Sequence, residues 1–385
     1  MRRVTQSEIG KALGLSAATV GLVVGNSNSP LRARLSAETV SKIRAKAQEL
    51  GYTPHKGAQM LRSGRSNLIV LLNFGGHTEI GGRRSYHVGR MVHEAGFDYQ
   101  TIDAYWWVGE GRKLLDQIID LRPRGVIVSG SMQAAVALEE LIEMGIPVVS
   151  IGGYVPHIPW VRYDARAAIK ELTMAAVHAG RRRLTLLLGA KSDAVAWQNM
   201  DRVEGFGDAI REAGGDAPIL SDDASTCSSY EESDRLQSNI VYSCSRQRPF
   251  HDFEPGMDAA GQIISREIKP DALICTNDKH AIGAMTTCSR RGVAVPGELW
   301  VTGFDNISFG TQGPVSLTSV DQRTDALCEA AFEMLMARLD RAAVAESIPE
   351  ERVIPCEIIW RDSTASPLHS TPPAGSHLHS QPVIS

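Results

Sequence analysis

Polar side chains that can bind a ligand follow two of the apolar stretches in the second half of the chain. Asn277 follows the stretch 272–275, and its amide can both donate and accept hydrogen bonds. Asp305 follows the stretch 300–304, and its carboxylate can accept hydrogen bonds from hydroxyl groups. Open parallel sheets bind ligands at the carboxyl ends of their strands. These positions therefore predict non-covalent binding of a small polar ligand.

Three further polar residues stand where helices are predicted to begin. Arg202 opens the helix predicted over 202–213. Its guanidinium can hold two hydroxyl groups or a carboxylate, or it can stay solvated at the helix end. Asp278 fits the cap of the next helix as well as it fits a ligand contact, and Asp164 is interpreted as a helix cap first.

The sequence carries no catalytic constellation. The patterns GxSxG, GxxxxGK[ST], HExxH and CxxC are absent, and no spacing pairs an acid with a base. The six cysteines are dispersed, which predicts reduced thiols rather than disulfides or a metal site. No apolar run approaches the length of about 20 residues that spans a bilayer. We therefore expect no enzyme, no cofactor, no metal and no membrane contact.

Charge is divided unevenly along the chain. Residues 1–66 hold eleven Lys and Arg against three Glu, a formal charge of +8, although the whole chain carries −4. The remaining residues therefore carry −12. A basic head on an acidic body predicts a module that binds a polyanion, joined to one that does not.

The basic head is predicted to be helical. Thr5 with Glu8 forms a capping box for a helix that ends at Gly14, with Ile9, Ala12 and Leu13 on its apolar face. Ser16 caps a second helix to about residue 24. Ser36 caps a third helix that directs Val40, Ile43, Ala47 and Leu50 inward and ends at Gly51. Two short helices joined by a tight turn are typical of a helix-turn-helix, and an ordinary three-helix bundle is the alternative.

From residue 67 the pattern alternates between apolar strands and amphipathic helices. Continuous apolar strands between such helices predict parallel sheets covered on both faces. Residues 218–250 are polar without a period and are interpreted as a long loop or insertion, and residues 362–385 as a disordered tail. The strands are expected at 68–72, 125–128, 147–151, 184–188, 272–275 and 300–304, and helices at 112–121, 134–144, 165–179, 202–213 and 257–268.

One family shares the motifs of the head. These are Val4-Thr5-x-x-x-Ile9-Gly10-x-x-x-Gly14-Leu15-Ser16-x-x-Thr19-Val20, then Gly25-Asn26, then Gly51-Tyr52-x-Pro54-x-x-x-Ala58-x-x-Leu61. Over residues 4–66 the chain resembles the LacI/GalR family of transcriptional repressors. The resemblance implies DNA contacts by Thr5, Ser16, Ala17, Ala18, Thr19, Gly21, Leu22, Asn26, Tyr52, His55, Ala58, Leu61 and Arg62.

The resemblance also implies a hinge helix over 55–63 that wedges Leu61 into the minor groove. The chain departs from the family where Ala17, Ala18, Gly21 and Leu22 replace polar base-reading residues. Alanines can touch thymine methyl groups but cannot make the bidentate hydrogen bonds that distinguish bases. We therefore expect hinge and backbone contacts to supply more of the DNA affinity than direct readout does.

The same resemblance continues to about residue 362, through Arg202-x-x-Gly205-Phe206, residues 270–278, Gly303-Phe304-Asp305-Asn306 and Ser319-Val320-Asp321-Gln322. It implies a core of periplasmic-binding-protein type, with two doubly wound lobes, three chain crossings and a small ligand, by preference a carbohydrate, in the cleft. The implied effector contacts are Asn73, Asp164, Arg202, Phe253, Asn277 and Asp305, with packing as the alternative for Phe253.

We therefore expect a small all-α helix-turn-helix domain (1–54), a hinge and linker (55–66), a two-lobed α/β core (67–361) and a tail (362–385). Lobe one is expected over about 67–161 and 323–350, and lobe two over about 162–320 and 351–361. The function expected is a cytoplasmic, ligand-responsive repressor that binds a pseudo-palindromic DNA operator as a homodimer or higher oligomer. The alternatives are a sugar-binding receptor or a sugar-converting enzyme core with a degenerate head.

Overall fold

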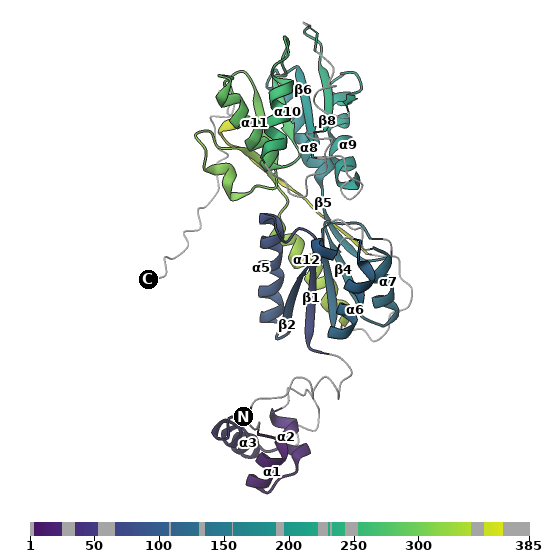
Figure 1. Ribbon diagram of the computed structural model, residues 1–385, viewed down its shortest axis with the longest axis vertical. Helices are drawn as coiled ribbons and strands as arrows, with labels where there is room; N and C mark the ends of the chain where they lie inside the picture. The colour runs from purple at the N-terminus through teal and green to yellow at the C-terminus, as the bar shows by residue number, and fades with distance from the viewer. Residues whose placement is uncertain are drawn as a thin grey trace. The chain divides into compact units, whose positions relative to one another are not determined.

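The fold was described from a computed structural model of the whole chain (Figure 1). The residues described are 4–24, 35–52, 66–107, 109–130, 135–155, 157–189, 196–221, 230–231, 233–242, 253–339 and 350–364. Contacts divide the chain into two compact units, and each is described by itself. The smaller comprises residues 1–68 with the stretch 118–124, and the larger comprises the rest.

Three helices form the head: α1 (Gln6–Leu13), α2 (Ala17–Val24) and α3 (Ala37–Glu49). The predicted capping box begins α1, because Thr5 Oγ1 accepts from Glu8 N at 3.3 Å and Glu8 Oε2 accepts from Thr5 N at 2.8 Å. Gly14 ends this helix with a left-handed φ of +69°, a conformation that glycine adopts without strain. The axes of α1 and α2 differ in direction by 112°, within the range of a helix-turn-helix.

A small apolar core holds these helices together. Ile9, Val20 and Ile43 are fully buried, one from each helix. Two predictions of inward-facing residues were wrong, because Ala12 is exposed and Leu50 is 36% exposed. Leu50 is the C-cap of α3, where the chain leaves the helix before Gly51, so its side chain is not on the buried stripe.

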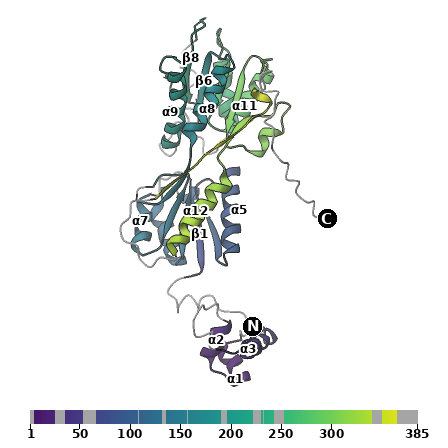
Figure 2. The same cartoon turned by 180° about the vertical axis from the view of Figure 1, so that it is seen from behind.

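The first sheet of the core has six strands in the order β12-β5-β4-β3-β1-β2, and the pairings recorded for it are parallel. Helices α5 and α12 pack together, as Figures 1 and 2 show, and bury apolar residues with β1, β3, β4 and β5. The elements are β1 (Leu68–Asn73), α5 (Glu79–Glu94), β2 (Asp98–Asp103), the 3-10 helix Ala104–Trp107, α6 (Gly111–Leu121), β3 (Gly125–Ser129), α7 (Ala135–Glu143), β4 (Val148–Ile151), β5 (Trp160–Tyr163), α12 (Thr324–Leu339) and β12 (Glu351–Ile354).

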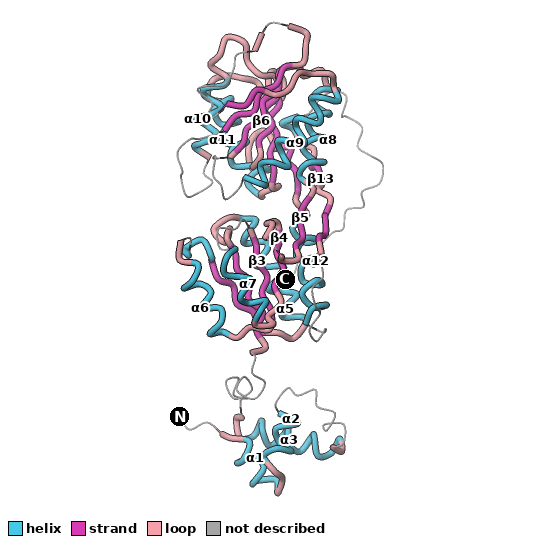
Figure 3. Tube along the Cα trace, turned by 90° about the vertical axis from the view of Figure 1, so that its right-hand side faces the viewer, coloured by secondary structure: helices cyan, strands magenta, loops and turns pink. Residues whose placement is uncertain are grey.

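The second sheet has seven strands in the order β13-β11-β10-β9-β6-β8-β7, parallel except for β13, which runs antiparallel to β11. Figure 3 shows α10 and α11 on one side of β6 and α8 and α9 on the other. Its elements are α8 (Ala165–His178), β6 (Arg183–Leu188), α9 (Ala196–Glu212), β7 (Ile219–Ser221), β8 (Gln237–Tyr242), α10 (Glu254–Ile263), β9 (Ala272–Cys275), α11 (Asp278–Arg290), β10 (Trp300–Phe304), the 3-10 helices Ser308–Thr311 and Asp362–Thr364, β11 (Thr318–Asp321) and β13 (Glu357–Ile359).

Alternate strand residues of the second sheet enter different cores. Leu186 and Ile274 join a core with residues of α8 and α9, whereas Leu187 and Leu273 join a core with residues of α10 and α11. The sheet is therefore covered on both faces, as the continuous apolar strands predict. The fold class expected from the sequence, a helix-turn-helix head with two parallel-sheet lobes, is confirmed.

Several boundaries differ from those expected. The strand Glu351–Ile354 pairs with β5 in the first sheet, although residues 351–361 were expected in lobe two. Helix α9 begins at Ala196, so the expectation that Arg202 opens this helix was wrong. Residues 218–250 are not only a loop, because β7 and β8 lie there and β8 pairs with β6 along six residues. Strand β7 has three residues and β8 begins with Gln237, Ser238 and Asn239, so neither contains a long apolar run.

Among the described residues, no single helix is long and apolar enough to cross a membrane. Helices α1 and α2 pass that test together, as a bent pair and by length and composition only.

Candidate functional site

The first turn of α2 presents small side chains to solvent. Ser16, Ala17 and Ala18 are exposed, and Thr19 is half-buried. Ser16 Oγ accepts a hydrogen bond from Thr19 N at 3.0 Å and lies 2.8 Å from Thr19 Oγ1. The serine hydroxyl thus caps the helix while it stays accessible, so it can also donate to an external acceptor such as a phosphate oxygen.

Two residues expected to contact DNA make contacts within the head. Gly21 is buried, and a Cβ at this position would lie 2.9 Å from Gln6 Oε1. Its expected DNA contact is therefore corrected, because Gly21 is buried against the end of the Gln6 side chain of α1. The hydroxyl of half-buried Tyr52 accepts from Gln6 Nε2 at 3.0 Å. Leu22 is half-buried and Thr5 is exposed beside its capping partner.

The remaining DNA contacts expected from the sequence lie outside the described residues. They are Asn26, His55, Ala58, Leu61 and Arg62, together with most of the hinge segment 55–66.

In the core, buried polar side chains gather where strands of both sheets end. We call this group the arginine cluster. Five of its seven members end a strand or directly follow one: Ser129 ends β3, Tyr163 ends β5, Phe304 ends β10, Asp305 follows β10 and Gln322 follows β11. The cluster consists of Arg84, Ser129, Tyr163, Arg202, Phe304, Asp305 and Gln322.

Arg202 reaches this cluster from the middle of α9. Its guanidinium carbon lies 4.4 Å from the centre of the Phe304 ring, and Nη2 contacts the Tyr163 hydroxyl at 3.5 Å. Only 7% of Arg202 is exposed. The structure therefore brings Arg202 and Asp305 into one site, although by a different helix geometry from the one expected.

Arg84 is a member of the cluster that sequence reasoning missed. It lies on α5 and donates from Nη1 to Ser129 Oγ at 3.2 Å and from Nη2 to Gln322 Oε1 at 3.0 Å. Gln322 Nε2 in turn donates to Asp305 Oδ1, so this chain of hydrogen bonds joins the two sheets. A signal for Arg84 exists in the sequence, because it shares the buried stripe of α5 with Val88 and Val92. An arginine on such a stripe needs a polar partner.

The environment of Asp305 raises the pKa of its carboxyl group. Burial raises the pKa of Asp305 to about 6, against the opposing fields of Arg202 and Arg84 and the hydrogen bond from Gln322. Its backbone φ of +109° lies in the region that non-glycine residues rarely adopt. Burial likewise raises the pKa of the Tyr163 hydroxyl, which stays a neutral donor.

The other expected effector contacts make local hydrogen bonds or ring contacts. Asn73 is buried: it donates to Gly81 O at 2.9 Å and to Ser85 Oγ at 3.0 Å, and accepts from Gly75 N at 3.2 Å. Asp164 caps α8 by accepting from Ala167 N at 3.0 Å. Phe253 packs against Phe309 with ring centres 5.4 Å apart.

Asn277, not Asp278, is the N-cap of α11, since Asn277 Oδ1 accepts from His280 N at 2.8 Å. Asp278 is buried one residue later and accepts from Ile307 N at 2.7 Å and Ser319 Oγ at 2.6 Å. The prediction of Asp278 as a cap was therefore wrong, because its side chain turns inward to hold the loop after β10. Neither residue contacts Arg202.

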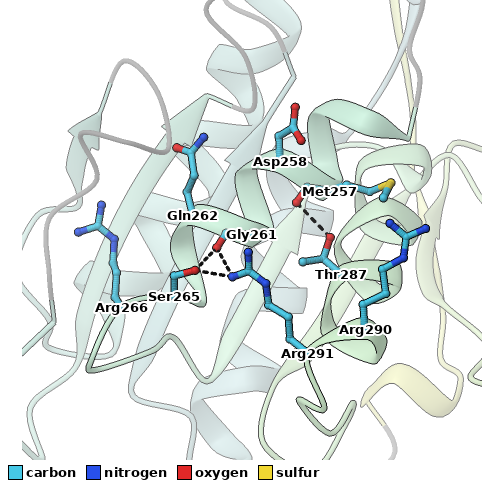
Figure 4. Close-up of a pocket in the computed structure, with 9 residues that line it drawn as sticks. All are labelled: Met257, Asp258, Gly261, Gln262, Ser265, Arg266, Thr287, Arg290 and Arg291. Carbon is cyan, nitrogen blue, oxygen red and sulfur yellow. Dashed lines mark hydrogen bonds between the residues drawn. The ribbon is translucent and has the colours of Figure 1, made fainter.

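A pocket of about 740 Å³ lies away from the cluster, between α10 and α11 (Figure 4). Arg291 crosses it and donates to Gly261 O and Ser265 Oγ, and Thr287 Oγ1 donates to Met257 O at 3.0 Å. These contacts tie the two helices together. The polar groups of the pocket therefore serve helix packing.

Comparisons with known proteins agree with this geometry. Residues 175–364 match the model of the periplasmic binding protein-like domain. The transcriptional regulator DegA of Bacillus subtilis is 25% identical over 374 residues, covering 96% of this chain and 100% of DegA. The lac repressor dimer bound to operator and anti-inducer is 18% identical with a TM-score of 0.74, covering 95% and 100% of the two chains. A complex of the regulator CelR with cellobiose is 19% identical with a TM-score of 0.61, covering 94% and 100%.

A helix-turn-helix head on a two-lobed core of periplasmic-binding-protein type defines a class of transcriptional regulators, not of enzymes. The chain is similar to regulators of this class over nearly its whole length, and the motifs of its head resemble those of the LacI/GalR family.

Proposed function

We propose that this regulator is a repressor that binds a pseudo-palindromic DNA operator as a homodimer, and that a small molecule at the arginine cluster controls its affinity. The observation that carries the DNA half is the exposed first turn of α2, on a helix bent by 112° from α1 in a head of charge +8. Two heads related by a two-fold axis read half-sites about one helical turn apart.

The exposed side chains of α2 are small. They support DNA binding through charge and through contacts with the DNA backbone more than through direct readout of bases. Ala17 and Ala18 are exposed but have no hydrogen-bonding side-chain atoms, whereas the basic head attracts phosphates. The acidic core repels DNA, which confines contact to the head and the adjoining hinge segment. The protein then acts in the cytoplasm, where its DNA lies.

The arginine cluster supports control by a ligand. Its hydrogen bonds run from Arg84 through Gln322 to Asp305, so a ligand there changes how the two sheets are linked. The solved complexes of lac repressor and CelR support a carbohydrate or its derivative as the effector. Operator and effector affinities are then reciprocally coupled, by about 1–3 kcal/mol.

Two matched serines test the DNA half. Ser16 caps α2 and Ser36 caps α3 with the same pair of contacts, to a threonine amide and a threonine hydroxyl three residues later. Each Ser→Ala change removes one cap and costs about 1 kcal/mol of stability. We expect only Ser16→Ala to weaken binding to DNA selected from a random pool, measured by fluorescence anisotropy.

The same titration repeated at several salt concentrations measures the ions released. We expect log K to fall linearly with log salt, with a slope set by the number of phosphates contacted. Equal losses for the two serine variants, or a slope near zero, would contradict a DNA-binding role for α2. A receptor without DNA function would show no saturable binding at any salt concentration.

A further inference from the structure

Two arginines lie in the turn between α6 and β3, where the hinge segment meets the core. Ser66, the last residue of that segment, donates to Arg122 O from its backbone N at 2.9 Å and from Oγ at 2.8 Å. The backbone N of Arg124 donates to the first carbonyl of β1 at 2.7 Å. By their contacts, residues 118–124 belong with residues 1–68 to the smaller unit. The turn therefore holds the end of the segment that leads to the head.

The guanidinium groups of these two arginines have unused hydrogen-bond donors. Arg122 is exposed, whereas Arg124 is half-buried and its Nε atom is buried with no hydrogen-bond partner. Among the residues that the structure describes, neither guanidinium forms an ion pair or a hydrogen bond. Arg112, at the other end of α6, instead pairs with Asp116 and Glu140, both at 2.7 Å. A buried N–H without an acceptor is uncommon in native proteins, so Arg124 indicates a partner outside the chain.

The carboxylates of the smaller unit do not pair with the two arginines. Three of its four acids are engaged within the head: Glu8 in the capping box, and Glu38 and Glu49 in ion pairs with lysines of α3. The fourth, Asp120, is exposed and forms no ion pair within the described part of the chain. The connecting segment 53–65 contains no Asp or Glu. The acidic partner of the turn is therefore not supplied by the head or by this segment.

Two acids of neighbouring elements limit the charge of this region. Asp98 begins β2 and Glu143 ends α7, and neither forms an ion pair with Arg122 or Arg124 where the chain is described. With Asp120 they offset the two arginines, so this end of the first sheet has no strong positive field. The turn therefore suits an anion that another part of the protein brings close to it.

DNA bound by the hinge segment is such an anion. Arg62, the last DNA contact expected in that segment, precedes Ser66 by four residues. Four residues span at most about 14 Å, so a duplex bound at Arg62 passes close to the turn. Guanidinium N–H groups only donate hydrogen bonds, in a planar arrangement that matches the oxygens of a phosphate.

We infer that Arg122 and Arg124 bind phosphates of the operator duplex beside the hinge segment. This inference rests on the proposed function and extends it, because it adds a DNA contact from the turn between α6 and β3. The turn then attracts DNA although the core as a whole is acidic. Phosphate contacts carry no sequence information, so the two arginines add affinity and fix the position of the core on the duplex.

Fluorescence anisotropy of the full-length protein, with a duplex selected from a random pool and at several salt concentrations, tests the inference. A homodimer that loses one phosphate contact per protomer should lose about 2 from the slope of log K against log salt. We expect this loss for Arg122→Gln, with at least about fivefold weaker binding at about 100 mM salt, and a larger loss when Arg124→Gln is added. Arg122→Lys keeps the charge and should largely keep the slope. Arg112→Gln, at the other end of α6, should change neither quantity.

An unrelated duplex of the same length separates a phosphate contact from a role in holding the hinge segment. Loss of a phosphate contact weakens binding to both duplexes alike, and Asp120→Asn, which removes a nearby negative charge, should strengthen both. An unchanged slope for the double variant, a loss confined to the selected duplex, or a loss that only follows lower stability in urea would overturn the inference. In each of these cases the unmodified protein still binds DNA. If the unmodified protein bound neither duplex, the proposed function itself would fail.

Discussion

The surface of α2 and the arginine cluster hold their side chains in opposite ways. On α2 the candidate contacts are small, exposed and already satisfied within the helix, as the bond between Ser16 and Thr19 shows. In the cluster the guanidinium groups of Arg84 and Arg202 are buried and only partly satisfied. The first arrangement suits a long polyanion bound by charge, and the second suits one small molecule that completes a set of hydrogen bonds.

This difference indicates which part of the molecule discriminates more strongly between its binding partners. A surface of alanines tolerates many DNA sequences, because it presents no donor or acceptor to base edges. A buried arginine tolerates few ligands, because a wrong one leaves its charge unpaired. The arginine cluster of the core is therefore expected to be more selective for its ligand than the surface of α2 is for a DNA sequence. Each of the following changes tests one of these two sites.

The largest effect is expected from a glycine that lets two core helices touch. A Cβ on Gly205 of α9 would lie 2.3 Å from the backbone oxygen of Arg166 in α8. Backbone cannot move aside cheaply, so Gly205→Ala should cost about 1–3 kcal/mol of core stability, measured by urea unfolding. It should also weaken effector binding, because Arg202 stands one turn away on α9.

Gly207→Ala on the same helix is the matched control. Its Cβ would meet the flexible end of Arg211 at 3.3 Å, so the alanine should be tolerated or stabilising. Because the head has its own apolar core, DNA binding by the head should survive Gly205→Ala. Equal unfolding free energies for the two variants would refute the close helix contact.

A second change gives the α2 surface the donor and acceptor that it lacks. Ala17→Gln places an amide at an exposed position of the first turn, where it can reach a base edge. We expect binding-site selection to show a new preference at one base pair of each half-site, worth about 1–3 kcal/mol. Ala12→Gln, exposed on α1, is the control. An unchanged operator preference would mean that α2 does not read bases.

The sequence predicted the helices and central strands because local signals coincide with tertiary ones. The capping pair Thr5 and Glu8 and the apolar runs at 272–275 and 300–304 gave those elements their observed positions to within a residue. The strand Gln237–Tyr242 could not be seen this way, because it lies beside the edge strand of the second sheet and mixes polar with apolar residues.

Only part of the arginine cluster was predictable from the sequence, because some of its residues stand in local motifs and others meet only in the folded chain. Arg202 and Asp305 stand in motifs, and the structure brings both to the cluster. Arg84 joins them from a helix more than a hundred residues away in sequence, through a contact that only the tertiary fold creates. Asn73 was expected at the ligand, yet where α5 approaches the turn at Gly75 its two amide hydrogens and one acceptor position are used locally.

A smaller effect is expected where α5 contacts the loop after β10. Glu79 accepts from Ser308 N at 2.9 Å and from Ser308 Oγ at 3.0 Å, and Arg83 donates to Asn306 O at 2.8 Å. These bonds hold α5 against the loop after β10. They therefore favour the position of α5 in which Arg84 donates to Gln322. Glu79→Gln should therefore weaken the binding of a carbohydrate effector, identified by a calorimetric screen of sugars and sugar derivatives, by about threefold to tenfold, since a net hydrogen bond is worth about 1 kcal/mol.

Glu94→Gln is the control for this change. Glu94 lies at the other end of α5 in an exposed pair with Arg90, so the variant should bind like the unmodified protein. Calorimetry gives the affinities and urea unfolding gives the stabilities. A loss of affinity that only follows a loss of stability would rule out a specific link between this contact and effector binding.

The last change concerns a pH dependence of stability set by Asp278. Burial, with the nearby charge of Asp305, raises the pKa of Asp278 to about 8 from 3.8, although Ser319, the Ile307 amide and Arg361 favour the charged form. A carboxyl group whose pKa is raised in the folded state contributes stability that is fully present below about pH 4. That contribution is lost as the pH rises towards 8 and changes little beyond it.

The melting temperature of the unmodified protein should therefore fall between pH 5 and pH 8 more than that of Asp278→Asn. The asparagine keeps an oxygen acceptor for the Ile307 amide and cannot ionise. Asp305, whose pKa burial raises to about 6, contributes the lower part of the same window and is present in both proteins. Asp258→Asn, on the exposed surface of α10, should follow the unmodified profile. Parallel profiles for Asp278→Asn and Asp258→Asn would show that hydrogen bonding, not burial, decides the charge of Asp278.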